Sequence, residues 1–104
     1  MNVKQSNREI REFFNFVCMP LLESKGEDYA GSKDADVFNT FKETAREFNI
    51  TKYQVWGVHF RKQLGAIYKY ICTGKLESES IDSRIADAIN YLFILRNMLE
   101  EDKK

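Results

Sequence analysis

The segment Ser80-Ile-Asp-Ser-Arg84-Ile-Ala-Asp87-Ala-Ile-Asn90-Tyr91-Leu-Phe-Ile-Leu-Arg-Asn-Met-Leu99 combines two patterns on one predicted helix. Apolar residues recur at helical spacing, as in a helix that packs against others. They are Ile81, Ile85, Ala88, Ile89, Leu92, Leu95 and Leu99. Beside them, Arg84, Asp87 and Tyr91 are spaced three and four apart, and Asn90 follows Asp87 by three. These four residues form a polar row, which is either a solvated face with an Arg84–Asp87 pair or the wall of a cleft.

Two further helices are expected in the first half of the chain. The first runs from about residue 7 to residue 24, because Ser6 and Glu9 have the spacing of a capping box. Pro20 lacks a backbone donor and predicts a kink or an early end of that helix. Residues 25–35 are expected to form a loop, and residues 36–48 the second helix.

The third helix has clear signals at both ends. Thr51 and Gln54 form a second capping-box pattern, and Gly74 is a typical helix stop. No strand-like alternation is present. The expected fold is therefore all-α, a bundle of four main helices in a single domain over residues 1–104, with residues 1–5 and 100–104 as frayed tails.

The composition narrows the class of function. Lysine plus arginine and aspartate plus glutamate number 16 each, which argues against non-specific binding of duplex nucleic acid. Cys18 and Cys72 match no metal spacing and are expected to be free thiols. No apolar run is long enough for a membrane, and residues 1–7 lack a signal-peptide pattern, so a cytoplasmic protein is expected.

The aromatic content predicts self-association. Eight phenylalanines, five tyrosines and one tryptophan are more ring surface than four short helices can bury alone. We expect a dimer or tetramer in which the third or fourth helix forms the interface.

Several polar residues are candidates for a binding site. In the segment Lys25–Gly31, Lys25 is cationic and Tyr29 can stack on a base. Glu43 and Glu47 are spaced by four on the second helix, and together with Asp87 they could hold Mg²⁺ beside a triphosphate. His59, the single histidine, is expected to be a packed residue rather than a ligand.

Several motifs resemble a family of small phage and prophage proteins grouped with nucleotide-modification-associated domains. The matching segments are Lys25-Gly-Glu-Asp28-Tyr29-Ala-Gly31, Asp36-Val-Phe-Asn-Thr-Phe41-Lys, Val55-Trp56, Lys62, Ser78-Glu79 and Arg84-Ile-Ala-Asp87-Ala-Ile-Asn90-Tyr91-Leu. More remotely, the chain is similar to the MazG-like all-α nucleoside-triphosphate pyrophosphohydrolases. That larger family implies an oligomeric helical bundle that hydrolyses a nucleoside triphosphate to a monophosphate and pyrophosphate with Mg²⁺.

The chain departs from the metal motif of that larger family. Where the family has Glu-x-x-Asp, this chain has Arg84 and Asp87, and a guanidinium attracts phosphate rather than Mg²⁺. The expected nucleotide-binding residues are Lys25, Asp28, Tyr29, Lys62, Arg84, Asp87, Asn90 and Tyr91. The metal candidates are Glu43, Glu47 and Asp87, and no catalytic residue is assigned.

Three functions remain open from the sequence. The first is a Mg²⁺-dependent (d)NTP pyrophosphohydrolase of MazG-like type with a degenerate metal motif. The second is a non-catalytic protein that sequesters a phosphorylated, for example cyclic, signalling nucleotide. The third is a helical interaction protein with no ligand. The resemblance to phage proteins implies the cytoplasm of a bacterial host.

Overall fold

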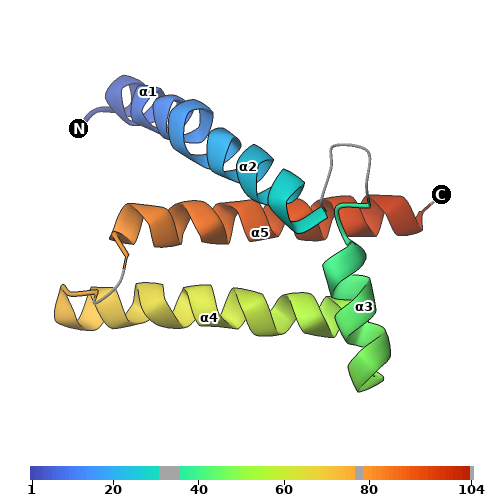
Figure 1. The fold of residues 1–104 in the computed structure, drawn as a ribbon. Coiled ribbons are helices and arrows are strands. Elements are labelled where there is room, and N and C mark those ends of the chain that lie inside the picture. Colours follow the sequence, from blue (N-terminus) through green and yellow to red (C-terminus); the bar gives the residue numbers. More distant parts are fainter. Residues whose placement is uncertain (31–35, 77–78, 104) are drawn as a thin grey trace.

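The chain folds into helices joined by short connections (Figure 1). The computed structural model describes residues 1–30, 36–76 and 79–103, except for the side chains of residues 27–30. Over these residues there are four helices and no strand, which confirms the all-α prediction. The elements are α1 (Val3–Phe13), the π-helical turn η1 (Phe14–Cys18) and α2 (Met19–Ala30), which form one continuous helix, then α3 (Asn39–Phe48), α4 (Lys52–Thr73) and α5 (Ile81–Asp102).

The first helix begins earlier than predicted. Its N-cap is Asn2, whose side chain accepts a hydrogen bond from the Gln5 amide at 2.8 Å. The Gln5 side chain in turn accepts from the Asn2 amide at 2.9 Å. The prediction of a cap at Ser6 was therefore wrong, because an equivalent capping box lies four residues upstream and a helix propagates once it has been nucleated.

Pro20 does not end the first helix, which continues through it. The π-helical turn η1 lies just before it, and α2 then continues to Ala30. The wider turn gives room where the proline ring would clash with the carbonyl one turn earlier. Lys25 and Gly26 are consequently helical, which corrects the predicted loop, and residues 31–35 lie outside the described residues.

The caps of the remaining helices are mostly those expected. The Thr51–Gln54 capping box and the Gly74 stop, with φ of 72°, are confirmed for α4. α3 begins at Asn39, later than predicted, and its C-cap Asn49 has a left-handed φ of 54°. Ser80, the first residue of the predicted last helix, is the N-cap of α5.

α5 continues past residue 99 because its last turn is held by α4. Lys52 donates a hydrogen bond to Asp102 at 2.6 Å, and the Tyr53 hydroxyl donates to the same carboxylate. The Asp102 carboxylate raises the pKa of Tyr53 to about 12. Residues 100–102, expected to fray, are therefore helical.

α4 and α5 run antiparallel, side by side, as a two-helix layer (Figure 1). α2 and η1 pack on α5, and α3 crosses the start of α4. The buried apolar side chains are Cys18, Phe38, Ala45, Val55, Ala86, Ala88 and Met98. These residues are few and three of the seven are alanines, so the single chain has a thin core.

Two residues of the polar row of α5 are buried, whereas part of its apolar stripe is exposed. Asp87 and Asn90 are each 6% exposed, whereas Leu92 is 50% exposed.

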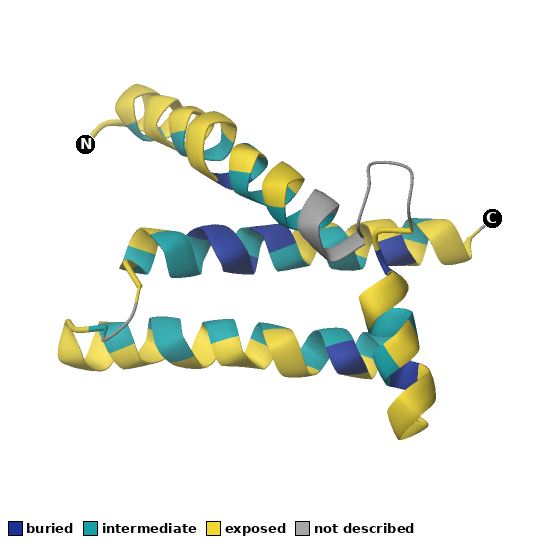
Figure 2. Cartoon of the chain, viewed as in Figure 1, coloured by how far each residue is buried: buried dark blue, intermediate teal, exposed yellow. Residues whose placement is uncertain are grey.

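α1 packs on no other helix among the described residues, and Figure 2 shows it almost wholly exposed. No helix in the described ranges has the length and apolar character needed to cross a bilayer.

Candidate functional site

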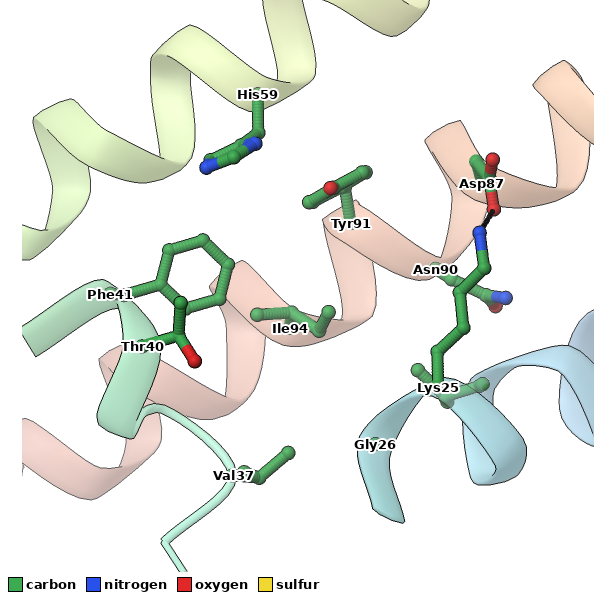
Figure 3. A pocket seen from close by; sticks show the side chains of 11 residues that line it. Lys25, Gly26, Val37, Thr40, Phe41, His59, Asp87, Asn90, Tyr91 and Ile94 are labelled. Atoms are coloured by element: carbon green, nitrogen blue, oxygen red, sulfur yellow. Dashed lines mark hydrogen bonds and ion pairs between the residues drawn. The ribbon is translucent and has the colours of Figure 1, made fainter. Parts of the chain in front are cut away.

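A cavity of about 210 Å³ lies between α2, α3, α4 and α5. Its walls come from all four helices and from the residue preceding α3 by two places. The lining residues are Leu22, Lys25, Gly26, Val37, Thr40, Phe41, His59, Asp87, Asn90, Tyr91 and Ile94. Figure 3 shows polar side chains at one end of the cavity and aromatic rings at the other.

An ion pair forms the polar end of the cavity. Lys25 Nζ donates a hydrogen bond to Asp87 Oδ1 at 2.8 Å, joining α2 to α5 (Figure 3). The Asp87 side chain is 8% exposed and that of Lys25 is 43% exposed. The carboxylate is thus largely desolvated, while the ammonium group lies at the rim, where it can also meet an anion from outside.

Asn90 lies beside this ion pair. Its Nδ2 donates a hydrogen bond to the Cys18 carbonyl at 3.0 Å, which fastens α5 to the end of the π-helical turn. Its Oδ1 is buried and has no hydrogen-bond partner among the described residues. A buried acceptor in this state costs about 1–3 kcal/mol, which a donor from a bound molecule would recover.

Three rings make the aromatic end. The His59 and Tyr91 rings are nearly parallel, with an interplanar angle of 11° and centroids 6.1 Å apart. Phe41 from α3 meets His59 edge to face at 5.8 Å. Burial, and then the positive charge of Lys62, lower the pKa of His59 below its ordinary 6.5, so the imidazole is neutral at pH 7.

A further contact fixes this wall. Trp56 Nε1 donates a hydrogen bond to the Tyr91 carbonyl at 2.7 Å. The bond ties α4, one turn before His59, to the backbone of Tyr91 on α5. The aromatic end is therefore held by a direct hydrogen bond between α4 and α5.

The structure brings together four of the residues singled out in the sequence. Lys25, Asp87, Asn90 and Tyr91 all line the cavity, although Lys25 lies 62 residues from Asp87 along the chain. Asp28 and Tyr29 are in the last turn of α2, and their side chains lie outside the described residues.

Arg84 and Lys62 do not line the cavity. Arg84 Nη1 donates to Gln63 Oε1 at 3.2 Å, and its Nε lies 3.5 Å from Glu79 Oε2. The expected Arg84–Asp87 pair is not formed, because the Asp87 carboxylate is turned toward α2 and bonded to Lys25. Arg84 instead links α5 to α4.

The carboxylates proposed for Mg²⁺ are not gathered around the cavity. Glu43 is exposed and accepts a hydrogen bond from Asn39 Nδ2 at 3.0 Å, and Glu47 is also exposed. Across the described residues, no three His, Cys, Asp or Glu side chains group as metal ligands do. Asp87, with Lys25 as its neighbour, does not fit a cation site of the MazG-like kind.

The sequence did not identify the remaining walls. Thr40 and Phe41 were named only within a segment that carries the family resemblance, and His59 was expected to be a packed residue rather than a ligand. A usable signal was present, since His59 shares a helix face with Val55, the most buried residue of α4. That face had to meet α3, and with it Phe41 and Thr40.

Comparison of the chain with protein-family models, curated proteins and solved structures gives no match.

Proposed function

We propose that the chain is a non-catalytic nucleotide-binding protein that holds the base of its ligand in the cavity between α2, α3, α4 and α5. The observation that carries the proposal is the convergence of Lys25, Asp87, Asn90 and Tyr91 on one hollow. These residues come from two distant segments, and they supply both signs of charge, an amide and an aromatic ring.

The two ends of the cavity suit the two properties of a nucleobase. Flat rings of Tyr91, His59 and Phe41 offer a surface for a planar heterocycle, and such base stacking contributes about 1–3 kcal/mol per base. A carboxylate accepts hydrogen bonds from ring and exocyclic N–H groups, and an amide both donates and accepts. Asp87 and Asn90 supply these groups, and the Asn90 Oδ1 still needs a donor.

The size of the cavity supports binding of the base rather than enclosure of a whole nucleotide. Its volume of about 210 Å³ is below the roughly 300–1,000 Å³ of sites that enclose a drug-sized ligand. The sugar and phosphate would therefore lie outside the mouth. Lys25, paired inward with Asp87 and partly exposed, is placed to meet a phosphate there.

Binding is favoured over hydrolysis because of where the carboxylates lie. Two-metal hydrolysis needs several carboxylates directed at the phosphates. Here Asp87 is neutralised by Lys25, and Glu43 and Glu47 lie away from the cavity lining. The residues that do line it are suited to recognition.

Calorimetry of the full chain with nucleosides, nucleoside mono-, di- and triphosphates and cyclic dinucleotides tests the proposal, each with Mg²⁺ and with EDTA. We expect one class to bind equally in both conditions, with no product by chromatography. Thr40→Trp, which adds a large ring at a lining position, should reduce the cavity and abolish binding. Glu43→Trp, on the same helix but off the lining, should not. Release of pyrophosphate, or equal binding by both variants, would overturn the proposal.

A further inference from the structure

The α4–α5 layer has two unlike faces. One face carries the cavity residues, including His59 of α4 and Asn90 of α5, and is covered by α2 and α3. The opposite sides of the same two helices form what we call the outer face. Its apolar residues are Phe60, Leu64, Ile67 and Ile71 of α4, and Ile85, Ile89, Leu92 and Leu99 of α5.

Helical geometry places these residues together. At 100° per residue, Leu64 lies about 140° around α4 from His59, and Leu92 lies about 160° around α5 from Asn90. Because the two helices are antiparallel neighbours, both stripes emerge on the same side of the layer. None of the helices α1, α2 and α3 packs there, since α2 and α3 occupy the cavity side.

The outer face is apolar to a degree unusual for a solvent-facing surface. Ile71 is 70% exposed, Leu92 is 50% exposed, and Leu64 and Leu99 are 47% exposed. The spacing is three and four in alternation, as from Leu64 to Ile67 to Ile71, which is the pattern of helices in four-helix bundles. A pair of helices with such a seam lacks the other half of a bundle.

The dimensions of the single chain agree with this interpretation. Its radius of gyration is 15.5 Å, whereas a compact domain of this size has a value of about 13 Å. The thin core and the open shape agree with an apolar surface of α4 and α5 that has no partner among the described residues.

We infer that the outer face is covered by the outer face of a second copy of the chain, so that α4 and α5 of two protomers form a four-helix bundle about a two-fold axis. A two-fold interface needs a patch that complements itself. The apolar stripes of α4 and α5 provide one, with the exposed Arg96 as a charged residue between Leu92 and Leu99. The opposite, cavity-bearing faces then point away from the interface, leaving both cavities open.

The area of the outer face is of the order that a stable dimer needs. From Ile81 to Leu99 the layer is about 27 Å long and two helix diameters, about 20 Å, wide. That footprint of about 500 Å² is corrugated, so interdigitating side chains bury more accessible area than its projection. A standard interface buries about 800 Å² on each partner.

Sedimentation equilibrium and light scattering of the full chain test the inference. We expect twice the chain mass of 12.2 kDa at micromolar concentration. Leu92→Glu puts a charge in the centre of the interface from both protomers and should weaken the dimer more than about 100-fold. The matched control is Phe48→Glu, which also changes an exposed apolar residue, 65% exposed, but on α3. It should remain dimeric.

A second measurement needs no variant. The unfolding midpoint of a dimer rises with protein concentration, and that of a monomer does not. We expect a rise for the wild-type chain. A mass of one chain with a concentration-independent midpoint would overturn the inference, and so would a folded Leu92→Glu variant as dimeric as Phe48→Glu.

Discussion

Replacing Lys25 by methionine should reveal how strongly the cavity depends on its ion pair. The substitution keeps most of the aliphatic stem and removes the ammonium group, which leaves the Asp87 carboxylate, 8% exposed, without its Lys25 partner. Removing one member of a fully buried pair costs about 3–5 kcal/mol. Since the Lys25 side chain is 43% exposed, water partly replaces it, and we expect a loss of about 2 kcal/mol.

A double-mutant cycle separates this cost from the loss of packing. Asp87→Asn removes the charge that needs a partner, so Lys25→Met should cost much less in that background, with a coupling energy of about 1–2 kcal/mol. Urea unfolding followed by circular dichroism, at one protein concentration, measures all four variants. Lys62→Met, which removes an exposed lysine outside the cavity, should change stability by less than about 0.5 kcal/mol. If Lys25→Met and Asp87→Asn are additive, the ion pair has no stabilising role and the reasoning is refuted.

Three other predictions concern single sites. Asp102 raises the pKa of Tyr53 from 10.0 to about 12, so Tyr53 should contribute stability that is complete below pH 10 and lost by pH 12. An absorbance titration should show a tyrosine ionisation near pH 12 that is missing in Tyr53→Phe. The pKa of His59, measured by NMR, should lie below 6.5. Protonation of His59 then favours the unfolded chain, so stability should fall as the pH drops through this range. Lys62→Gln should raise the pKa of His59, and an unchanged pKa would contradict a contribution from the charge of Lys62. Asn49 has a left-handed φ of 54°, so Asn49→Gly should raise the free energy of unfolding by up to about 1 kcal/mol and Asn49→Ala should lower it by a similar amount. Thermal unfolding measures both variants, and the reverse order would be inconsistent with a left-handed cap.

The parts of the fold that sequence predicted well are those governed by neighbouring residues. The ends of α4 follow from Thr51, Gln54 and Gly74, which act within a few residues of the ends that they fix. The start of α1 was missed because two capping-box patterns, at Asn2 and at Ser6, compete, and local spacing does not decide between them. The π-helical turn before Pro20 was not predicted, because the proline indicated only a kink or an end and its spacing does not show how the helix accommodates the ring.

The candidate site shows the same division between local and distant causes. Helical spacing put Asp87, Asn90 and Tyr91 on one face, and all three line the cavity. Spacing also favoured Arg84 as the partner of Asp87, but Lys25, from the other end of the chain, holds the carboxylate. Contacts between helices depend on crossing geometry, which a single sequence does not specify.

The apolar stripe of α5 is less buried in the single chain than its sequence pattern predicted. It was expected to pack, and within one chain Leu92 and Leu99 are about half exposed. The sequence pattern describes what a residue will contact in the finished assembly, including contacts made with other chains. In a bundle shared by two protomers, the same residues would be core residues.

The π-helical turn has a consequence for comparing this chain with its evolutionary relatives. Such a turn amounts to one residue inserted into an α-helix, and each residue corresponds to a rotation of about 100°. A chain of the same fold without the insertion would carry the apolar positions of its first thirteen residues one place out of step with Val3 and Ile10. An alignment should therefore place a one-residue gap between residues 14 and 18. If the gap is placed anywhere else, residues on different sides of the helix are equated.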